Sequence, residues 1–543
     1  QKRKNRDYHG VFLDIEGGTP FEAWVTEVCD FLQQYEYEKY HVSHPVTTVN
    51  WPTLDPLDHP SESTYGDVTQ SQQDSEACAG VPIEDTESLD LSKIRSHKGN
   101  GFFALYHVYP YYPDFMNYDY LAQENPYLAY LKALKKHHGK QPVLIAEFGV
   151  PSSREAAHWH RNGWHHGGHS DARQGEINGL LMQAIHEAGM AGGVLFSWFD
   201  EWFKRNWLFQ PYELPAERKP LWFNLQDPEE NYGLLAAYPG YPGKKVNLAC
   251  RNEDWKNAVV LYEKEKDPTA FRFHDGGDDA RRLRRLSVQH DEGFLYLLLE
   301  TGGSLDFTRA NYLIGLNTCA SEIGERLLPF GTNVMSPIGL TFIVQVAGKK
   351  RSRILTAASY DKYLNMSTGI IRPVDSNEGA WVMMQNEPNI RRHSRDGKRV
   401  FPPRLFSMSR LTFGSLDVKN PDYNSLADFF YCDTKIELRI PWGLINVTDP
   451  SSRTVLWMDK NSETRKTNGI GILAVSYKPE DGGPAARRTG GPSNHTNSLP
   501  TELTAARVKT YSWDGWDTPI YHTYLKESYY RYQKVLRSIP EDI

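Results

Sequence analysis

The stretch "PVLIAEFG", residues 142–149, decides the interpretation of the fold. Residues 143–146 are apolar, and Glu147 follows them directly. A charge at the end of a buried strand is costly unless it is paired or used. We therefore interpret this stretch as a buried strand whose end carries a functional glutamate.

Apolar runs and helical patterns alternate on both sides of this stretch, between residues 8 and 210. We expect strands over residues 10–18, 45–52, 101–110, 142–149 and 192–202, and helices over 20–36, 125–139 and 176–189. Such alternation predicts a parallel sheet. Polar and aromatic residues gather at the carboxyl ends of these strands, where a (β/α)8 barrel (TIM barrel) carries its active site. Because a closed barrel has eight strands, we expect an upstream segment or a partner chain to supply the others.

The pattern changes after the Pro/Gly-rich stretch "YPGYPGKK", residues 238–245. Short strands are expected over residues 293–301, 312–318, 340–348 and 435–445, without alternating helices, and a strand passing into a helix over 519–539. This predicts a β-sandwich. The chain is thus expected to be α/β plus all-β, with a partial barrel over residues 1–245 and a sandwich over residues 246–543.

Composition excludes several classes of protein. The net charge is −7 with no long basic tract, which excludes nucleic-acid binding. No segment approaches the roughly 18 apolar residues that span a membrane. The five cysteines form no CxxC pair, so a metal ribbon is excluded, one or two disulfides remain open, and at least one thiol is free. No cofactor is predicted.

Aromatic residues make up 13% of the chain, which favours a carbohydrate ligand because sugar rings pack on Trp and Tyr. Filling of the core is the alternative role for these side chains. Two carboxylates at strand ends, Glu16 and Glu147, are what glycoside hydrolysis requires. The alternative for both glutamates is a structural role, which for Glu147 would be that of a helix cap or of a partner of Arg154.

"LIAEFG" resembles the nucleophile strand of clan A glycoside hydrolases, (β/α)8 enzymes that include families 2 and 5. The resemblance places residues 142–149 on the seventh strand, so the five expected strands become strands four to eight. It implies that Glu147 is the nucleophile and Glu16 the acid/base residue. One departure is clear, because Ile15 stands where the clan usually has Asn before the acid/base glutamate.

The same resemblance extends to the sugar site. "YHVYPYYP" resembles the end of a sixth strand in this clan, and "FSWFDEW" resembles an eighth strand with an aromatic platform. We expect the substrate to be bound by His107, Tyr109, Trp51, Trp198, Asn50, Glu201 and Trp202.

The second region also resembles a known class of domain. "DWKNAVVLYE", "GFLYLLLET" and "KIELRIPWGLI" are similar to family 9 carbohydrate-binding modules and DOMON domains, with Trp255 and Trp442 as the matching tryptophans. The resemblance implies a sandwich without identifying its ligand. A domain that serves packing alone is the alternative.

The sequence therefore predicts a retaining glycosidase that acts on a polysaccharide or oligosaccharide outside the cell or in the cell envelope. One alternative is a non-catalytic glycan-binding or assembly protein with a degenerate barrel, which Ile15 favours. Another is a metal-dependent hydrolase that uses the loop "HWHRNGWHHGGHS", residues 158–170, because imidazole is a common metal ligand. We predict no metal at the site.

Overall fold

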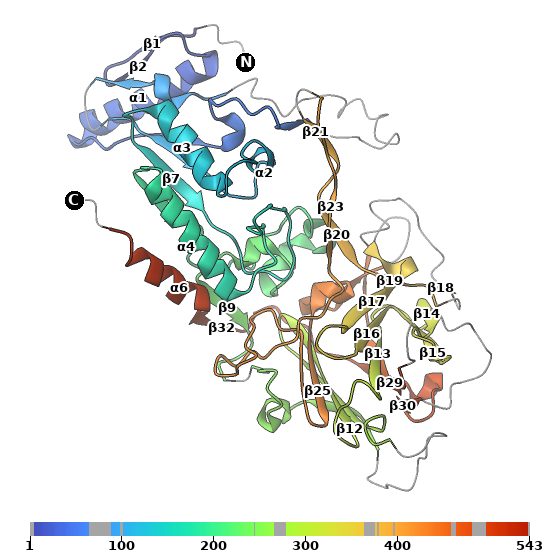
Figure 1. Ribbon diagram of the computed structural model, residues 1–543. Coiled ribbons are helices and arrows are strands. Elements are labelled where there is room, and N and C mark those ends of the chain that lie inside the picture. Colours follow the sequence, from blue (N-terminus) through green and yellow to red (C-terminus); the bar gives the residue numbers. More distant parts are fainter. Residues whose placement is uncertain are drawn as a thin grey trace.

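The computed structural model describes residues 5–64, 88–97, 101–243, 245–264, 278–362, 375–376, 379–394, 397–457, 463–479 and 496–540. The chain is mixed α/β (Figure 1). Its N-terminal part holds the long helices, and its C-terminal region consists mainly of antiparallel strands.

Four parallel strands form the central sheet of the N-terminal part, in the order β3-β6-β7-β8. They are β3 (Val49–Asn50), β6 (Ala104–His107), β7 (Val143–Phe148) and β8 (Gly192–Leu195). The parallel pairing agrees with the strand–helix alternation of the sequence. Because β3 and β8 remain edge strands, the described residues form an open sheet and not a closed barrel.

The helices of this part begin and end where local sequence signals place them. They are α1 (Pro20–Tyr40), the short α2 (Phe115–Tyr118), α3 (Pro126–His138) and α4 (Asp171–Glu187). Thr19 and Glu22 form a reciprocal capping box before α1, and proline occupies its first turn. Asn125 caps α3, and Ser170 caps α4.

The predicted position of residues 10–18 in the parallel sheet is wrong. The strand here, β2 (Leu13–Ile15), pairs antiparallel with β1 (Tyr8–His9) and β5 (Arg95–Ser96). Asp30 on α1 accepts hydrogen bonds from the backbone of Phe12 (2.7 Å) and Leu13 (2.8 Å). These bonds attach the segment to α1, and its strand belongs to a separate small sheet.

Two antiparallel sheets dominate the C-terminal region. The first has the order β10-β11-β12-β25-β24, and the second β19-β17-β16-β13-β29-β30 with β31 beside β29. Their strands are β10 (Val259–Glu263), β11 (Leu283–His290), β12 (Phe294–Thr301), β13 (Asn311–Asn317), β16 (Phe342–Val346), β17 (Arg353–Ala357), β19 (Trp381–Met383), β24 (Phe429–Cys432), β25 (Lys435–Pro441), β29 (Ile470–Tyr477), β30 (Asn497–Leu499) and β31 (Lys509–Tyr511). Both sheets contribute to one buried cluster, which includes Leu297 and Ile314. The β-sandwich assignment itself stays a prediction.

Short strands form further small sheets of two or three strands. They are β4 (Ser63–Thr64), β14 (Gly324–Leu327), β15 (Met335–Leu340), β18 (Asp375–Ser376), β20 (Gln385–Asn389), β21 (Arg392–Ser394), β22 (Val400–Phe401), β23 (Arg404–Ser407), β26 (Val447–Asp449), β27 (Thr454–Leu456) and β28 (Thr464–Lys466). Among them, β21 pairs with β4 and so links the two parts. Figure 1 shows β20 to β23 rising from the C-terminal region toward the N-terminal part.

The end of the chain returns to the N-terminal part, as a strand and a helix like those expected. Strand β32 (Tyr521–Leu525) pairs with β9 (Leu235–Pro239), and α6 (Glu527–Leu536) lies along α4 (Figure 1). A Cβ at Gly175 or Gly179 of α4 would collide with α6, so the two helices pack closely. Packing therefore crosses the predicted boundary at residue 245, and the domain division stays a prediction.

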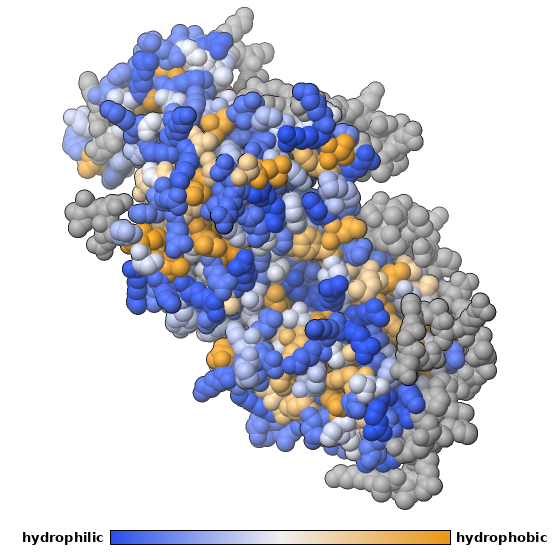
Figure 2. All heavy atoms as spheres, viewed as in Figure 1, coloured by the Kyte–Doolittle hydropathy of each residue, from blue (hydrophilic) through white to orange (hydrophobic). Residues whose placement is uncertain are grey.

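Apolar side chains reach the surface beside these two helices (Figure 2). Leu180 on α4, Val194 on the edge strand β8 and Leu536 on α6 are exposed. In the described part of the chain, no helix combines the length and apolar character needed to cross a membrane.

Candidate functional site

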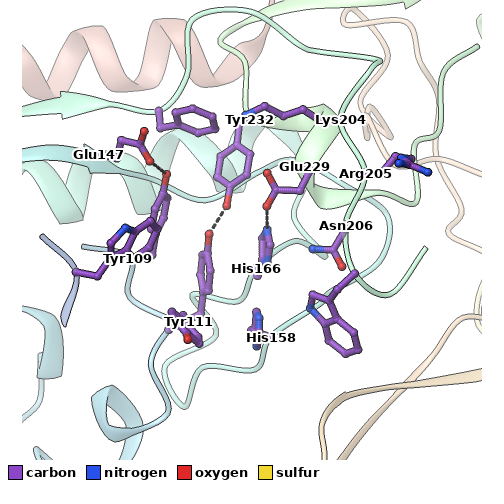
Figure 3. Close-up of a pocket in the computed structure, with 14 residues that line it drawn as sticks. Tyr109, Tyr111, Glu147, His158, His166, Lys204, Arg205, Asn206, Glu229 and Tyr232 are labelled. Carbon is purple, nitrogen blue, oxygen red and sulfur yellow. Dashed lines mark hydrogen bonds and ion pairs between the residues drawn. The ribbon is translucent and has the colours of Figure 1, made fainter. Parts of the chain in front are cut away.

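A pocket of about 460 Å³ lies where the four parallel strands end. Trp51 follows β3, Tyr109 follows β6, Glu147 lies near the end of β7, and Phe196 follows β8. Ligand sites of parallel sheets form at this edge. The lining consists of Trp51, Tyr109, Tyr111, Tyr112, Glu147, His158, His166, Phe196, Lys204, Arg205, Asn206, Trp207, Glu229 and Tyr232 (Figure 3).

Glu147 is held in place through one of its two carboxylate oxygens. Oε2 accepts a hydrogen bond from the hydroxyl of Tyr109 (2.8 Å) and lies 3.1 Å from Nδ1 of His107. Oε1 makes no hydrogen bond to any described residue. Burial lowers the pKa of His107, and the charge of Glu147 only partly offsets this. The carboxylate is therefore oriented, with one oxygen left for a ligand.

Aromatic rings surround this carboxylate. Trp51 stacks on Tyr109, with ring centroids 6.2 Å apart, and meets His107 edge-on at 5.2 Å. Burial raises the pKa of Tyr109, with smaller contributions from nearby Tyr111 and Glu147, so its hydroxyl stays a donor. The predicted group of Trp51, His107, Tyr109 and Glu147 is thus brought together by the fold, although His107 supports Glu147 without lining the pocket.

A second polar group crosses the pocket beside Glu147. The hydroxyls of Tyr111 and Tyr232 share a hydrogen bond, and His166 lies flat against Tyr111 with centroids 4.5 Å apart (Figure 3). Nε2 of His166 lies 3.1 Å from Oε1 of Glu229. Burial alone would raise the pKa of Glu229, but the contact with His166 and the charges of His166 and Lys204 together outweigh it and lower that pKa.

The structure does not bring Glu16 into this pocket. Glu16 follows β2, its side chain is 59% exposed, and its carboxylate lies 3.9 Å from the guanidinium of Arg95. It is not among the pocket's lining residues. The assignment of Glu16 as the acid/base partner of Glu147 depended on a place in the parallel sheet that β2 does not occupy.

Four predicted substrate-binding residues have other positions. Asn50 is buried, and its amide donates to the Leu89 carbonyl (2.9 Å). Trp198 is exposed but meets Tyr529 of α6 and does not line the pocket. Glu201 pairs with Lys204 at 3.1 Å, and Trp202 is a core residue whose indole donates to the Ala237 carbonyl. Of these four side chains, only Asn50 and Trp202 are buried.

The histidine loop is packed into the structure. Burial lowers the pKa of His160 to about 3 and that of His165 to about 4. The backbone N–H of His160 donates to Nδ1 of His165 (2.8 Å), which links these two residues within the loop. Across the described ranges, no three histidines of the loop converge as metal ligands would.

One buried group of three carboxylates has the spacing of a metal site, outside the loop. Glu213, Asp227 and Glu230 offer oxygens within 4.8 Å of one another. Lys219 contacts Glu230 at 2.6 Å, and the Asn224 amide donates to Glu213 at 2.8 Å. Burial raises the pKa of all three carboxyls. Since protein donors already occupy part of this group, we interpret it as a buried polar network.

Several pocket residues were not singled out as site residues from the sequence. Tyr111 and Tyr112 lie in the quoted motif "YHVYPYYP", so the aromatic run was a usable signal. Residues 204–207, in "DEWFKRNW", carry two cations, an amide and an indole in a row. Glu229 and Tyr232 lie at a short 3-10 turn over Pro228–Asn231, which carries no periodic pattern.

Comparisons with known proteins found no relative of this chain. No protein family, no curated protein and no solved structure matches it.

Proposed function

We propose that this pocket binds a carbohydrate chain and cleaves a glycosidic bond, with Glu147 as the nucleophile. The observation that carries the proposal is the position of Glu147 near the end of β7, where Oε2 is held by Tyr109 and Oε1 makes no hydrogen bond to any described residue. A carboxylate held in this way can present its second oxygen to the anomeric carbon of a sugar.

The aromatic lining supports a sugar as the ligand. Trp51 and Trp207 line the pocket while 36% and 48% exposed, respectively, so both indoles offer surface to a ligand. Sugar rings pack on such faces, and hydroxyls bind the polar groups between them. A pocket of about 460 Å³ falls in the range of drug-sized ligands, which favours more than one sugar unit.

The chemical step would follow the retaining route. Oε1 of Glu147 forms a bond to the anomeric carbon, and the glycosidic C–O bond breaks with its electron pair on the leaving oxygen. That oxygen takes a proton, and water later cleaves the glycosyl ester. With Glu16 outside the pocket, the closely paired side chains of Glu229 and His166, 3.1 Å apart, are the candidate proton donor among the lining residues.

A second candidate function is glycan binding without cleavage. Two observations favour it: Glu16 lies outside the pocket, and the lowered pKa of Glu229 is the opposite of what a general acid needs. The aromatic lining would serve this function equally well.

Trapping the glycosyl–enzyme distinguishes the two candidates. The protein is incubated with 2-deoxy-2-fluoro glycosides of glucose, galactose, mannose and xylose that carry dinitrophenolate as leaving group. This leaving group needs no proton donor, so the experiment tests the nucleophile alone. We expect mass spectrometry to find a covalent sugar on Glu147, and Glu147→Gln to abolish labelling, a loss of roughly a thousandfold or more in rate.

Glu187→Gln is the matched control, because Glu187 is 60% exposed on α4 and pairs with Lys132. It should label as the wild type does. A sugar on another residue, or no label on a protein that still binds oligosaccharides, would reject Glu147 as nucleophile and favour glycan binding.

The expected completion of a barrel by an upstream segment or a partner chain stays a proposal. Its support lies in the edge strands β3 and β8, where Val49 and Val194 are exposed, because parallel sheets are usually covered on both faces. The extracellular or envelope location is likewise proposed, and the disulfide between Cys250 and Cys432 supports it, because disulfides persist in oxidising compartments.

A further inference from the structure

Residues 204–207 form the side of the pocket away from Glu147. Figure 3 shows Arg205 and Asn206 on the far side of the pocket from Glu147. This segment combines the ammonium of Lys204, a guanidinium, an amide and the half-exposed indole of Trp207. A sugar unit bound here would be some distance from the group that attacks the glycosidic bond.

Most charged side chains that line the pocket already have a partner. Glu147 binds Tyr109, Glu229 binds His166, and Nζ of Lys204 lies 3.1 Å from Glu201. Lys204 also lies over the ring of Phe196, 4.0 Å from its centroid. These groups can contact a ligand, but none of them requires one.

Arg205 differs from them. It is half-buried, and it forms no hydrogen bond and no ion pair with any residue that the structure describes. Its positive charge partly offsets the raised pKa of the buried carboxyl of Glu213, although the two side chains form no ion pair. A guanidinium offers five N–H donors, and a partly desolvated one without acceptors is unfavourable. Carboxylate and sulfate groups match its planar fork with two parallel hydrogen bonds.

We propose that the glycan bound in this pocket is acidic, and that its carboxylate or sulfate group binds Arg205. The adjoining sugar ring packs on Trp207, and the amide of Asn206 binds a hydroxyl of the same unit. This inference rests on the proposed function and adds the substrate class to it. The acidic group lies away from Glu147, so the two negative charges do not meet.

The test measures binding on the Glu147→Gln background, which prevents cleavage. The probes are tetrasaccharides of glucose, galactose and mannose, each as the neutral hexose, the hexuronate and the 6-sulfate, titrated by calorimetry. For at least one sugar, an acidic form should bind at least about tenfold more tightly than its neutral counterpart. The difference should shrink as salt increases, because exposed charges are screened. The hexuronate and sulfate arms identify which anion is recognised.

Variants assign the effect to Arg205. Arg205→Gln should remove the preference for the acidic form and change binding of the neutral form by less than about threefold. Arg205→Lys, which keeps the charge without the fork, should retain part of the preference. Arg173→Gln is the control, because Arg173 is an exposed residue of α4 paired with Glu176. It should behave as the parent does.

The outcomes separate the two proposals. Equal binding of acidic and neutral forms, or a preference that survives Arg205→Gln, overturns the acidic-glycan inference and leaves the carbohydrate site intact. Absence of binding by all nine tetrasaccharides overturns the proposed function itself.

Discussion

The parallel sheet of the N-terminal part and the two antiparallel sheets of the C-terminal region bury their strands to different extents. Every residue of β13 and of β29 is buried, whereas no residue of β8 is, and Val194 on β8 is 55% exposed. The strands that carry the pocket are two to six residues long, and β11, β12 and β29 have eight each. The longest fully buried strands thus lie in the C-terminal region, and the pocket lies at the end of shorter, less buried strands.

Truncation of one strand side chain in each region should make this difference in burial measurable. Leu297 lies in the middle of β12, fully buried, and faces Val288 and Leu438 on its neighbours. Leu297→Ala should lower the free energy of unfolding by about 2–5 kcal/mol, because it leaves a cavity. Val194→Ala on β8 should change it by no more than about 0.5 kcal/mol. Urea denaturation followed by circular dichroism measures both, and equal effects would contradict the comparison.

The disulfide predicts a smaller effect, again confined to the C-terminal region. It joins Cys250 to Cys432 at the end of β24, across 182 residues of chain, and restricts the unfolded state over that length. The double variant Cys250→Ala, Cys432→Ala should unfold with a free energy lower by about 2–4 kcal/mol. Chemical denaturation with and without dithiothreitol measures this.

Reductant provides the control for that experiment. Dithiothreitol should bring the wild type to the stability of the double variant and leave the double variant unchanged. If it destabilises both proteins equally, the disulfide is not the source of the difference. The wild type and the double variant both retain the free thiols Cys29 and Cys319.

The sequence predicted the elements of the N-terminal part better than their pairing. Apolar runs and caps such as Asn125 are local signals, and they located α3 and β7 within a few residues. The partner of β2 depends on hydrogen bonds to Asp30, from another element, and no local pattern reveals them. The incorrect placement of the strand before Glu16 in the parallel sheet follows directly from that missing contact.

The candidate site could likewise be predicted only in part, for the residues that regular strands carry. His107, Tyr109 and Glu147 meet because neighbouring parallel strands end at one edge, which the alternation of strands and helices implies. Glu229 and Arg205 reach the pocket from segments without helix or strand periodicity, so only the folded chain places them there. Sequence patterns identify what regular elements carry, and they miss what irregular segments add.

The last predicted effect separates the two regions by pH. Burial opposes the charge on His59, in the N-terminal part, but Asp119 and Asp55 outweigh it and raise its pKa to about 9. Burial raises the pKa of Asp291, in the C-terminal region, to about 7 against hydrogen bonds from Tyr296 and the backbone. Both groups hold their proton more tightly in the folded state than their ordinary pKa values of about 6.5 and 3.9 imply.

The sign is therefore the same for both groups, but the pH windows differ. Stability contributed by protonated Asp291 is complete below about pH 4 and is lost as pH rises to about 7. The contribution of protonated His59 is complete below about pH 6.5 and is lost as pH rises to about 9. One proton changes the free energy of unfolding by at most about 1.4 kcal/mol per pH unit.

Denaturation at pH 5, 7 and 9 tests these windows with one variant for each region. Asp291→Asn should flatten the decline between pH 5 and 7 and leave the decline between pH 7 and 9 as in the wild type. His59→Gln should do the reverse. Loss of both declines in one variant would mean that the two regions respond to pH together, and it would contradict the separate windows. Retention of the wild-type slope in His59→Gln would show that Asp55 and Asp119 do not hold His59 protonated, and the buried contacts at 3.1 Å and 3.5 Å would then be those of a neutral imidazole.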